Sequence, residues 1–276
     1  MTTIVALWAD THPNSRTGLC PETLQLDGVG SPGTYQANAV QRECWQHWLE
    51  YWHEIAELKR KLKTRIIGVQ DGDGSDDNKH DAAGLITANK ADMLKIAEAV
   101  LQPAREVCDD LIIVRGTPAH VGEQAWSEEI LAKLVDATPD KEAGQFSWWY
   151  WPAEVEGVKF HVAHRPPTTG QKAWTRDAAV GRASAEVRYE YLGKGEQPPD
   201  VAAFGHFHFW RDSGRSKKPT VLFLPPWCVM DAYAITKGKV ALATEIGGVW
   251  VVCSEGTAHI GWHTWKAGGK ALWKSG

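Results

Sequence analysis

The chain has 276 residues and the composition of an ordinary globular protein, with 43% hydrophobic and 23% charged residues. This balance excludes an intrinsically disordered chain. The formal net charge of −4, without any block of basic residues, disfavours a nucleic-acid binder that depends on a broad positive surface.

The first residues, MTTIVALWADTHP, predict a core strand and not a signal peptide, because they lack a basic segment and contain only a short apolar run. No segment of the sequence is long enough to span a membrane. The five cysteines show no CxxC spacing, which is typical of reduced thiols. These features predict a cytoplasmic protein with no membrane partner.

The first half of the chain predicts strands and helices in alternation. Apolar runs predict strands at 3–9, 65–70 and 111–116. Amphipathic patterns predict helices at 35–63, 88–107 and 123–135. Alternation of this kind is typical of right-handed crossovers and a parallel sheet. A loop rich in proline and glycine is expected from 13 to 33.

Tryptophan is unusually frequent, with 15 residues. Trp45, Trp48 and Trp52 fall at i, i+3 and i+7 and so form one helical stripe, which predicts core packing. In FSWWYWP, at 146–152, neighbouring aromatic residues on a strand must face opposite ways. This segment therefore predicts contact with a second packed layer or with a partner subunit, such as a homo-oligomer that uses the Trp-rich surface.

The second half predicts a different arrangement of elements. We expect a helix at 172–192 and strands at 146–151, 158–164, 200–209, 220–226 and, in several pieces, 240–265. Because no repeat or linker interrupts the pattern, we expect one domain over 1–276. The expected fold class is α/β, a two-sheet β-sandwich flanked by helices in four layers, αββα.

Potential metal ligands follow the ends of five predicted strands. They are Asp10 with His12, Asp71 with Asp73, His120, His164, and His206 with His208. In open α/β sheets the functional crevice lies at the carboxyl ends of the strands. Carboxylates mixed with imidazoles suit Mn, Fe, Zn or Co better than Ca or Mg alone. The last two histidines, at i and i+2 of a strand, are expected to point to the same face.

The order of these motifs resembles that of the calcineurin-like binuclear metallophosphoesterases, and is similar to their phage- or prophage-type members. That family has Asp-x-His, Gly-Asp, Gly-Asn-His, a later His and Gly-His-x-His. This chain has, in the same order, Asp10-Thr-His12, Gly72-Asp73, Gly116-Thr-Pro-Ala-His120, His164 and Gly205-His206-Phe-His208. The resemblance extends from residue 4 to about residue 210.

The resemblance implies a metal-dependent phosphoesterase in which a hydroxide bridges two divalent transition-metal ions. The ions would be Mn, Fe, Zn, Co or Ni, with Mn favoured. One ion would be held by Asp10, His12 and His208, the second by His164 and His206, with Asp73 bridging both. His120 corresponds to the catalytic histidine of the family, which protonates the leaving oxygen or stabilises the transition state.

One segment departs from the family pattern. The family has an asparagine, a ligand of the second ion, directly before its histidine, whereas here Thr117 follows Gly116 and two residues intervene before His120. A threonine hydroxyl is a poorer ligand than an amide oxygen. Two interpretations therefore stay open: Thr117 is a weak ligand of the second ion, or His120 itself binds metal.

Other polar residues near these motifs are expected to have no direct role. Asp71, Asp76 and Asp77 are predicted to be solvated loop residues or to lie outside the ligand shell. His161 is out of phase with His164 on its strand and is expected to face elsewhere.

Phosphodiesters are the expected substrates, while monoesters and triesters stay open. The alternative within the enzyme class is a metal-dependent nuclease, for which Arg165, Arg176, Arg182 and Arg188 could build a local basic patch. The alternative outside the enzyme class is a non-catalytic interaction module that a metal stabilises.

Overall fold

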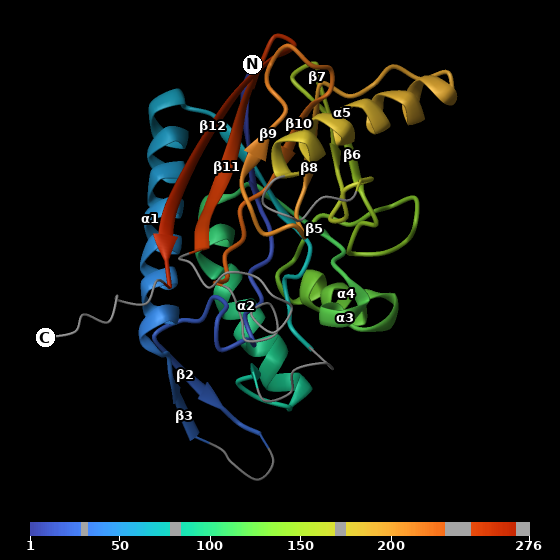
Figure 1. The fold of residues 1–276 in the computed structure, drawn as a ribbon. Coiled ribbons are helices and arrows are strands. Elements are labelled where there is room, and N and C mark those ends of the chain that lie inside the picture. Colours follow the sequence, from blue (N-terminus) through green and yellow to red (C-terminus); the bar gives the residue numbers. More distant parts are fainter. Residues whose placement is uncertain (29–32, 78–83, 169–174, 230–243, 269–276) are drawn as a thin grey trace, which may run out of the picture.

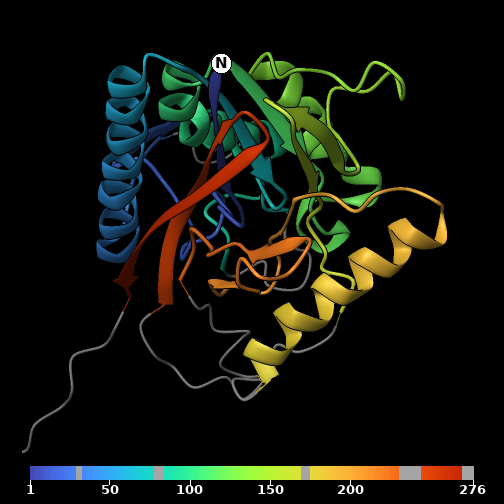
Figure 2. The same cartoon turned by 90° about the horizontal axis from the view of Figure 1, so that it is seen from above.

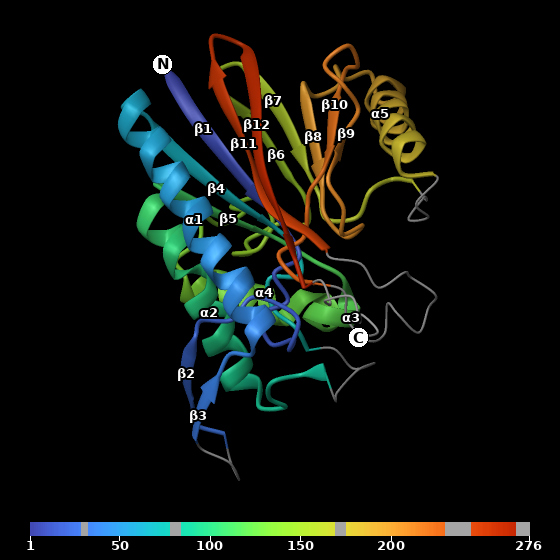
Figure 3. The ribbon, with the colours of Figure 1, turned by 60° about the vertical axis from the view of Figure 1, so that its left-hand side comes forward.

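The computed structural model describes residues 1–276 apart from 29–32, 78–83, 169–174, 230–243 and 269–276. Its described part is built from two five-stranded sheets with helices on their outer faces (Figure 3). The fold class expected from the sequence is confirmed.

The first sheet combines the early strands with the last two. In spatial order it contains β12 (Thr257–Ala267), β11 (Thr244–Ser254), β1 (Thr2–Trp8), β4 (Arg65–Asp71) and β5 (Asp110–Val114). β1 pairs with β4 and β4 with β5 in parallel, while β11 is antiparallel to both of its neighbours. The parallel arrangement predicted for the three early strands is therefore present.

The second sheet is formed by the middle of the chain. In spatial order it contains β6 (Trp151–Val155), β7 (Val158–Val162), β8 (Val201–Phe204), β10 (Thr220–Phe223) and β9 (Arg211–Asp212). β8 lies at its centre and is parallel to both β7 and β10.

Helices cover the outer faces of the two sheets, and α1 and α5 lie on opposite flanks of the molecule (Figure 2). The helices are α1 (Ala39–Leu62), α2 (Lys90–Val107), α3 (Pro118–Val121), α4 (Trp126–Leu134) and α5 (Arg176–Gly193). Pro103 lies inside α2. None of the helices in the described ranges is long and apolar enough to cross a membrane.

Three hydrophobic clusters separate the four layers. One lies between the first sheet and α1, α2 and α4, and contains the tryptophan stripe, with Trp48 fully buried against Trp8. A second lies between the two sheets, where Val5 and Leu7 of β1 belong to the same cluster as Val201 of β8. The third packs α5 against the second sheet. Burial of apolar surface in all three layers is the main force that holds the sheets and helices together.

Four expectations from the sequence are wrong in detail. The region expected to be a loop before α1 contains a hairpin, β2 (Thr23–Leu26) with β3 (Gly33–Gln36), which extends away from the sheets (Figure 1). The helix that follows begins only at Ala39, because the side chain of Asn38 caps it by accepting a hydrogen bond from the Gln41 amide. In 146–151, the strand begins only at Trp151.

The fourth correction concerns the segment with two histidines. β8 ends at Phe204, so His206 and His208 lie in the following loop and not on a strand. The strand ends there because the amide of His206 donates to Asp10 Oδ2, at 2.9 Å, and so leaves the ladder. The alternation of side chains along a strand therefore does not explain how these two imidazoles are placed.

Candidate metal centre

The candidate centre lies where the carboxyl ends of the central strands of both sheets meet. The segments that follow β1 and β4 stay paired with each other. The amide of Asp10 donates to Gly72 O and the amide of His12 donates to Asp73 O, each at 3.1 Å. From the second sheet, the loop after β8 reaches the same place through its bond to Asp10. The ends of strands far apart in the sequence thus place polar side chains around one point.

The six residues expected to bind metal through carboxylate or imidazole are brought together. Two groups have their potential ligand atoms within 4.8 Å of one another: Asp10, His12 and Asp73, and Asp73, His164 and His206. Asp73 belongs to both groups. His208 joins the first, because its Nε2 atom lies 3.1 Å from Asp10 Oδ1. Which of these residues bind metal stays a prediction, but their grouping matches the one that the resemblance implies.

Buried polar atoms in this cluster fit a bound cation. Asp10 Oδ1, His12 Nε2 and His164 Nε2 are buried, and none makes a hydrogen bond with any described residue. His164 Nε2 lies 3.2 Å from Asp73 Oδ2 without the geometry of a hydrogen bond. An unsatisfied buried polar atom costs free energy, so several that converge on one point are best explained by a ligand that they share.

The remaining nitrogen of His164 supports this interpretation. Its Nδ1 atom donates to the carbonyl oxygen of Asp71 at 2.7 Å. That bond fixes the ring and leaves the lone pair of Nε2 available for coordination. The sharp turn behind it requires Gly72, with φ of +75°, because a Cβ there would lie 2.4 Å from the His164 ring.

The charges of the cluster are strongly coupled. Burial alone would raise the pKa of Asp10, but the adjacent His208 and His164 lower it to about 2. Burial alone would lower the pKa of His12, but the carboxylates of Asp76, Asp73 and Asp10 raise it to about 9. Each group is thus held in its charged form by opposite charges, as expected where carboxylates and imidazoles surround a common point.

The backbone is also unusual at these positions. Five of the six residues have left-handed conformations, with φ of 55° at Asp10, 39° at His12, 50° at Asp73, 68° at His206 and 56° at His208. Such conformations are uncommon outside glycine and cluster at functional sites, where the surrounding structure maintains them. They turn each side chain out of its strand direction and toward the cluster.

Thr117 and His120 lie beside the cluster in different ways. Thr117 is the residue before α3, and its amide and hydroxyl both contact Asp73 Oδ1, at 2.7 and 3.2 Å. His120 lies on α3 with its Nδ1 atom 2.9 Å from Asp76 Oδ1, and its ring meets that of His12 edge to face at 4.4 Å. The structure therefore gives Thr117 a hydrogen bond to the expected bridging carboxylate. The same His120 ring also belongs to a third group of potential ligands, with His12 and Asp76.

Three buried carboxylates lie near the centre. Of the two alternatives expected for Asp71 and Asp76, their burial excludes that of solvated loop residues and leaves that of residues outside the ligand shell. Asp76 lies between His12 and His120, where it can orient both rings. Glu128 of α4, which no motif indicated, accepts hydrogen bonds from the amides of Gly74 and Gly116 and so fixes the loops that carry Asp73 and Thr117. Burial raises the pKa of Asp71 to about 8 and that of Glu128 to about 7.

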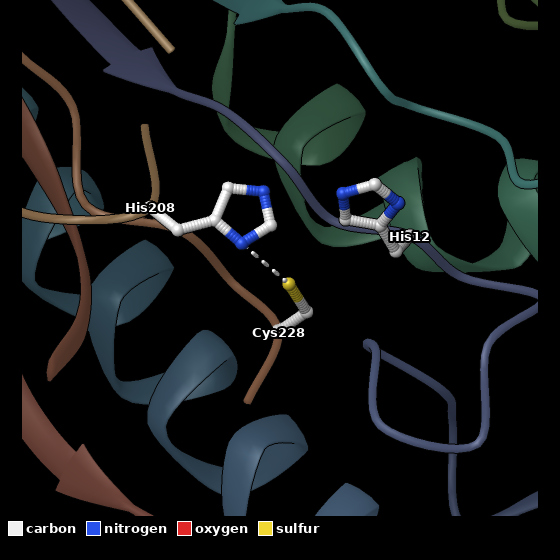
Figure 4. A group of neighbouring side chains, drawn as sticks. All are labelled: His12, His208 and Cys228. Atoms are coloured by element: carbon white, nitrogen blue, oxygen red, sulfur yellow. Dashed lines mark hydrogen bonds between the residues drawn. The ribbon is translucent and has the colours of Figure 1, made fainter. Parts of the chain in front are cut away.

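Cys228 is the other residue that motif reasoning missed. Its sulfur forms a group of potential ligands with His12 and His208 (Figure 4). It follows β10 as Asp10 follows β1, so the rule that ligands occur at strand ends could have found it.

Comparisons with known proteins give little further information. No protein-family model matches the sequence, and no curated protein matches it. Among solved structures, Chaetomium thermophilum Vps29 aligns over 97% of this chain and 99% of its own, at 10% identity and a TM-score of 0.38. Thermus thermophilus sulfate thiohydrolase SoxB, in complex with glycerol, aligns over 96% of this chain and 56% of its own, at 13% identity and a TM-score of 0.41. At such low scores, the cluster itself is the basis for assigning a function.

Proposed function

We propose that the chain is a binuclear metal-dependent phosphoesterase of the calcineurin-like type, with phosphodiesters as its preferred substrates. The observation that carries this proposal is the pair of ligand groups that share Asp73. One carboxylate common to two groups supports two adjacent cation positions, which is the arrangement that clamps a phosphoryl group in two-metal hydrolases. Asp10, His12 and His208 would hold the first ion, and His164 and His206 the second.

When bound, two such ions supply an activated water at neutral pH and neutralise negative charge on the phosphoryl oxygens. The residues of the chain have the other roles. Asp73 and Asp10 provide the negative charge that holds cations together at short range. Thr117 donates to Asp73 Oδ1 and so orients that carboxylate. Glu128 holds the two loops in place through Gly74 and Gly116.

His120 is suited to act on the leaving group. Its Nδ1 atom is occupied by Asp76, so Nε2 is the ring nitrogen that can reach a substrate. The contact with the Asp76 carboxylate at Nδ1 fixes the orientation of the ring, so that Nε2 can act on the leaving oxygen or stabilise its charge. The side chain of His120 is 26% exposed, which permits contact with a bound ester.

Hydrolysis of p-nitrophenyl phosphates tests the proposal. Protein that has been stripped of metal should be inactive and should recover activity with Mn²⁺, Co²⁺ or Zn²⁺, with the bis ester hydrolysed faster than the mono- and triesters. A faster monoester or triester would change the substrate class but not the reaction. Metal binding without turnover of any ester would instead favour the non-catalytic interaction module, and cleavage of DNA or RNA alone would favour the nuclease.

A further inference from the structure

The outer edge of β12 is the longest free strand edge among the described residues. β12 runs over 11 residues, from Thr257 to Ala267, and pairs only with β11. Its register with β11 is continuous along its whole length, so no bulge turns the edge away from solvent. A strand edge of this kind carries unpaired amide and carbonyl groups, which can pair with a strand of another chain.

The other three edges of the two five-stranded sheets are short or blocked. Amides of residues outside the sheet donate to the β5 carbonyls of Leu111 and Ile113, at 2.7 and 2.8 Å. β6 contains Pro152, which lacks an amide proton. β9 has only 2 residues. The edge of β12 therefore lacks the protection that the other three edges have.

The turn before β12 determines which of its backbone groups point outward. Glu255 and Gly256 join β11 to β12, and both have positive φ, of 49° and 75°, as a type I′ turn requires. In such a hairpin the flanking pair, Ser254 and Thr257, is hydrogen-bonded, and hydrogen-bonded pairs then alternate along the ladder. The residues of β12 between these pairs direct their amide and carbonyl groups outward; they are Ala258, Ile260, Trp262, Thr264 and Lys266.

The hydrogen bonds of β11 agree with this assignment. Gly247 lies opposite Thr264 in the ladder, and its amide points away from β12 and donates to Pro226 O at 3.2 Å. No backbone hydrogen bond between described residues outside the ladder involves the outward groups of β12. These groups are thus available to a second strand.

The outward groups are self-complementary about Trp262. Two β12 edges can meet antiparallel with each Trp262 opposite its counterpart. Ile260 of one chain then lies opposite Thr264 of the other. Ala258 likewise lies opposite Lys266, so every outward residue enters a hydrogen-bonded pair, with about ten bonds between the chains.

Charge does not oppose this pairing. β12 contains no acidic residue, and Lys266 is its only lysine or arginine. No two like charges are directly opposite in this register. The two Lys266 residues lie at opposite ends of the paired strands, roughly 27 Å apart. Their repulsion is screened, because the Debye length at physiological salt is about 8 Å.

The side chain at the centre of the register also suits a second copy. Trp262 is 47% exposed, although its ring packs against that of Trp210 with centroids 5.2 Å apart. Pairing about this residue places the two Trp262 side chains side by side on one face of the joined sheet. Each then covers exposed apolar surface of the other.

We propose that β12 is a homodimer interface, in which the edges of two chains pair antiparallel about Trp262 and join their first sheets into one continuous sheet. A second copy is the favoured partner because a single register pairs every outward group, opposes no like charges and covers Trp262. This surface is distinct from the segment 146–152, for which the sequence predicted a second packed layer or a partner subunit. The inference goes beyond the proposed function and does not depend on bound metal.

Sedimentation equilibrium of the full-length protein tests the association. At micromolar concentration the wild-type protein should have twice the mass of one chain. Trp262→Lys removes the aromatic contact and places like charges opposite each other, so association should weaken at least about 10-fold. Tyr189→Lys on α5 is the matched control, because Tyr189 is 71% exposed and lies away from β12. It should leave the dimer unchanged.

Cross-linking tests the register. In a hydrogen-bonded antiparallel pair the two Cα atoms lie about 5.5 Å apart. A short bismaleimide should therefore join Trp262→Cys to its counterpart. Lys266→Cys should not be joined, because its counterpart is roughly 27 Å away. The wild-type protein measures the background from its 5 native cysteines.

The possible outcomes decide between the interface and its alternatives. The mass of a single chain at all concentrations would overturn the proposal and would leave the edge to a strand of another protein. A dimer that cross-links through Lys266→Cys and not through Trp262→Cys would reject this register. A dimer that Trp262→Lys does not weaken would place the interface on another surface. None of these measurements involves metal or substrate, so each result leaves the proposed function unaffected.

Discussion

The hydrogen bond between His120 Nδ1 and Asp76 leaves Nε2 of His120 as the nitrogen that can contact a substrate. If His120 acts at the leaving group, His120→Ala should lower the rate about 10²–10⁴-fold while both ions stay bound. The loss should be smaller for p-nitrophenyl esters than for alkyl esters, because a good leaving group needs little protonation. Steady-state rates and elemental analysis on the same samples check this. An unchanged rate would mean that His120 has no catalytic role, and a lost ion would make it a ligand.

Asp73 is the residue whose loss should affect both ions. Asp73→Asn removes a charge that would offset the mutual repulsion of two cations, so metal content should fall at both positions, more than for any other single ligand. Metal analysis after dialysis measures this. Asp77→Asn is the matched control, because Asp77 is close in sequence but pairs with Lys90 and belongs to no ligand group in the described chain. Two retained ions in Asp73→Asn would move the bridging role to Asp71.

His161 provides a prediction away from the centre. Burial and the charge of Lys194 lower its pKa to about 4, from 6.5 in an exposed state. The unfolded chain therefore binds this proton more tightly than the folded one. The contribution of neutral His161 to the free energy of unfolding is therefore complete above pH 6.5. This contribution is lost as the pH falls toward 4, by up to about 3 kcal/mol.

The difference between wild type and His161→Phe isolates this contribution. Urea unfolding at pH 7 and pH 4.5 should show a smaller pH dependence for the variant. An identical pH dependence would mean that His161 does not titrate differently in the two states. The substitution also removes the contact of 3.0 Å between His161 Nδ1 and the Tyr191 hydroxyl, so only the change with pH, and not the offset at pH 7, tests the prediction.

At the scale of single residues, the sequence predicts ligands where they follow an apolar run. Asp10 and His164 could be found this way, because the end of a strand is visible in the hydrophobic pattern. The roles of Asp76 and Glu128 could not be predicted, since they depend on loops that meet only in three dimensions. His206 and His208 were expected at the centre for a reason that is wrong. Their positions depend on a left-handed backbone in the loop after β8, and not on the alternation of side chains along a strand.

The elements β4 and β5 end so close together that no side chain fits between their loops. A Cβ on Gly116 would lie 2.2 Å from both the amide nitrogen and Oδ1 of Asp73. Gly116→Ala should therefore displace the expected bridging carboxylate, lower the free energy of unfolding by about 1–3 kcal/mol and reduce metal content.

Gly181→Ala on α5 is the control for that substitution. A Cβ at Gly181 meets nothing within 4 Å, so alanine should stabilise the helix by about 0.5–1 kcal/mol and leave metal binding unchanged. Chemical unfolding and metal analysis of both variants measure these effects. Normal metal content in Gly116→Ala would show that the two loops can separate without loss of the centre.

Among the elements, those with long periodic patterns could be predicted and those fixed by distant partners could not. The parallel strands and α1 follow from continuous apolar runs and from the tryptophan stripe. The hairpin of β2 and β3 was missed because its strands are only four residues each and partly exposed. In 146–150, aromatic residues suggested a strand, but Trp148 forms only an isolated bridge with Val114, in which its amide donates to Ile113 O.

For the whole molecule, the centre connects the two sheets. Asp10 and Asp73 follow strands of the first sheet, while His164, His206 and Cys228 follow strands of the second. A bound ion should therefore stabilise the sandwich as a unit. At a metal concentration 100-fold above Kd, the gain is about 2.7 kcal/mol for each ion. Thermal unfolding with Zn²⁺ and with EDTA should differ accordingly, and Asp73→Asn should reduce the difference.

The spread of the ligands along the chain also determines when the centre can form during synthesis. A ribosome completes Asp10, His12 and Asp73 early, well before the histidines of the second sheet and Cys228 have emerged. Until then the nascent chain has the two carboxylates of the proposed centre without most of its imidazoles, and it should not bind an ion as the complete chain would. If the proposed centre binds metal, loading should therefore be one of the last events of folding, because a chain that ends before β8 lacks His206 and His208.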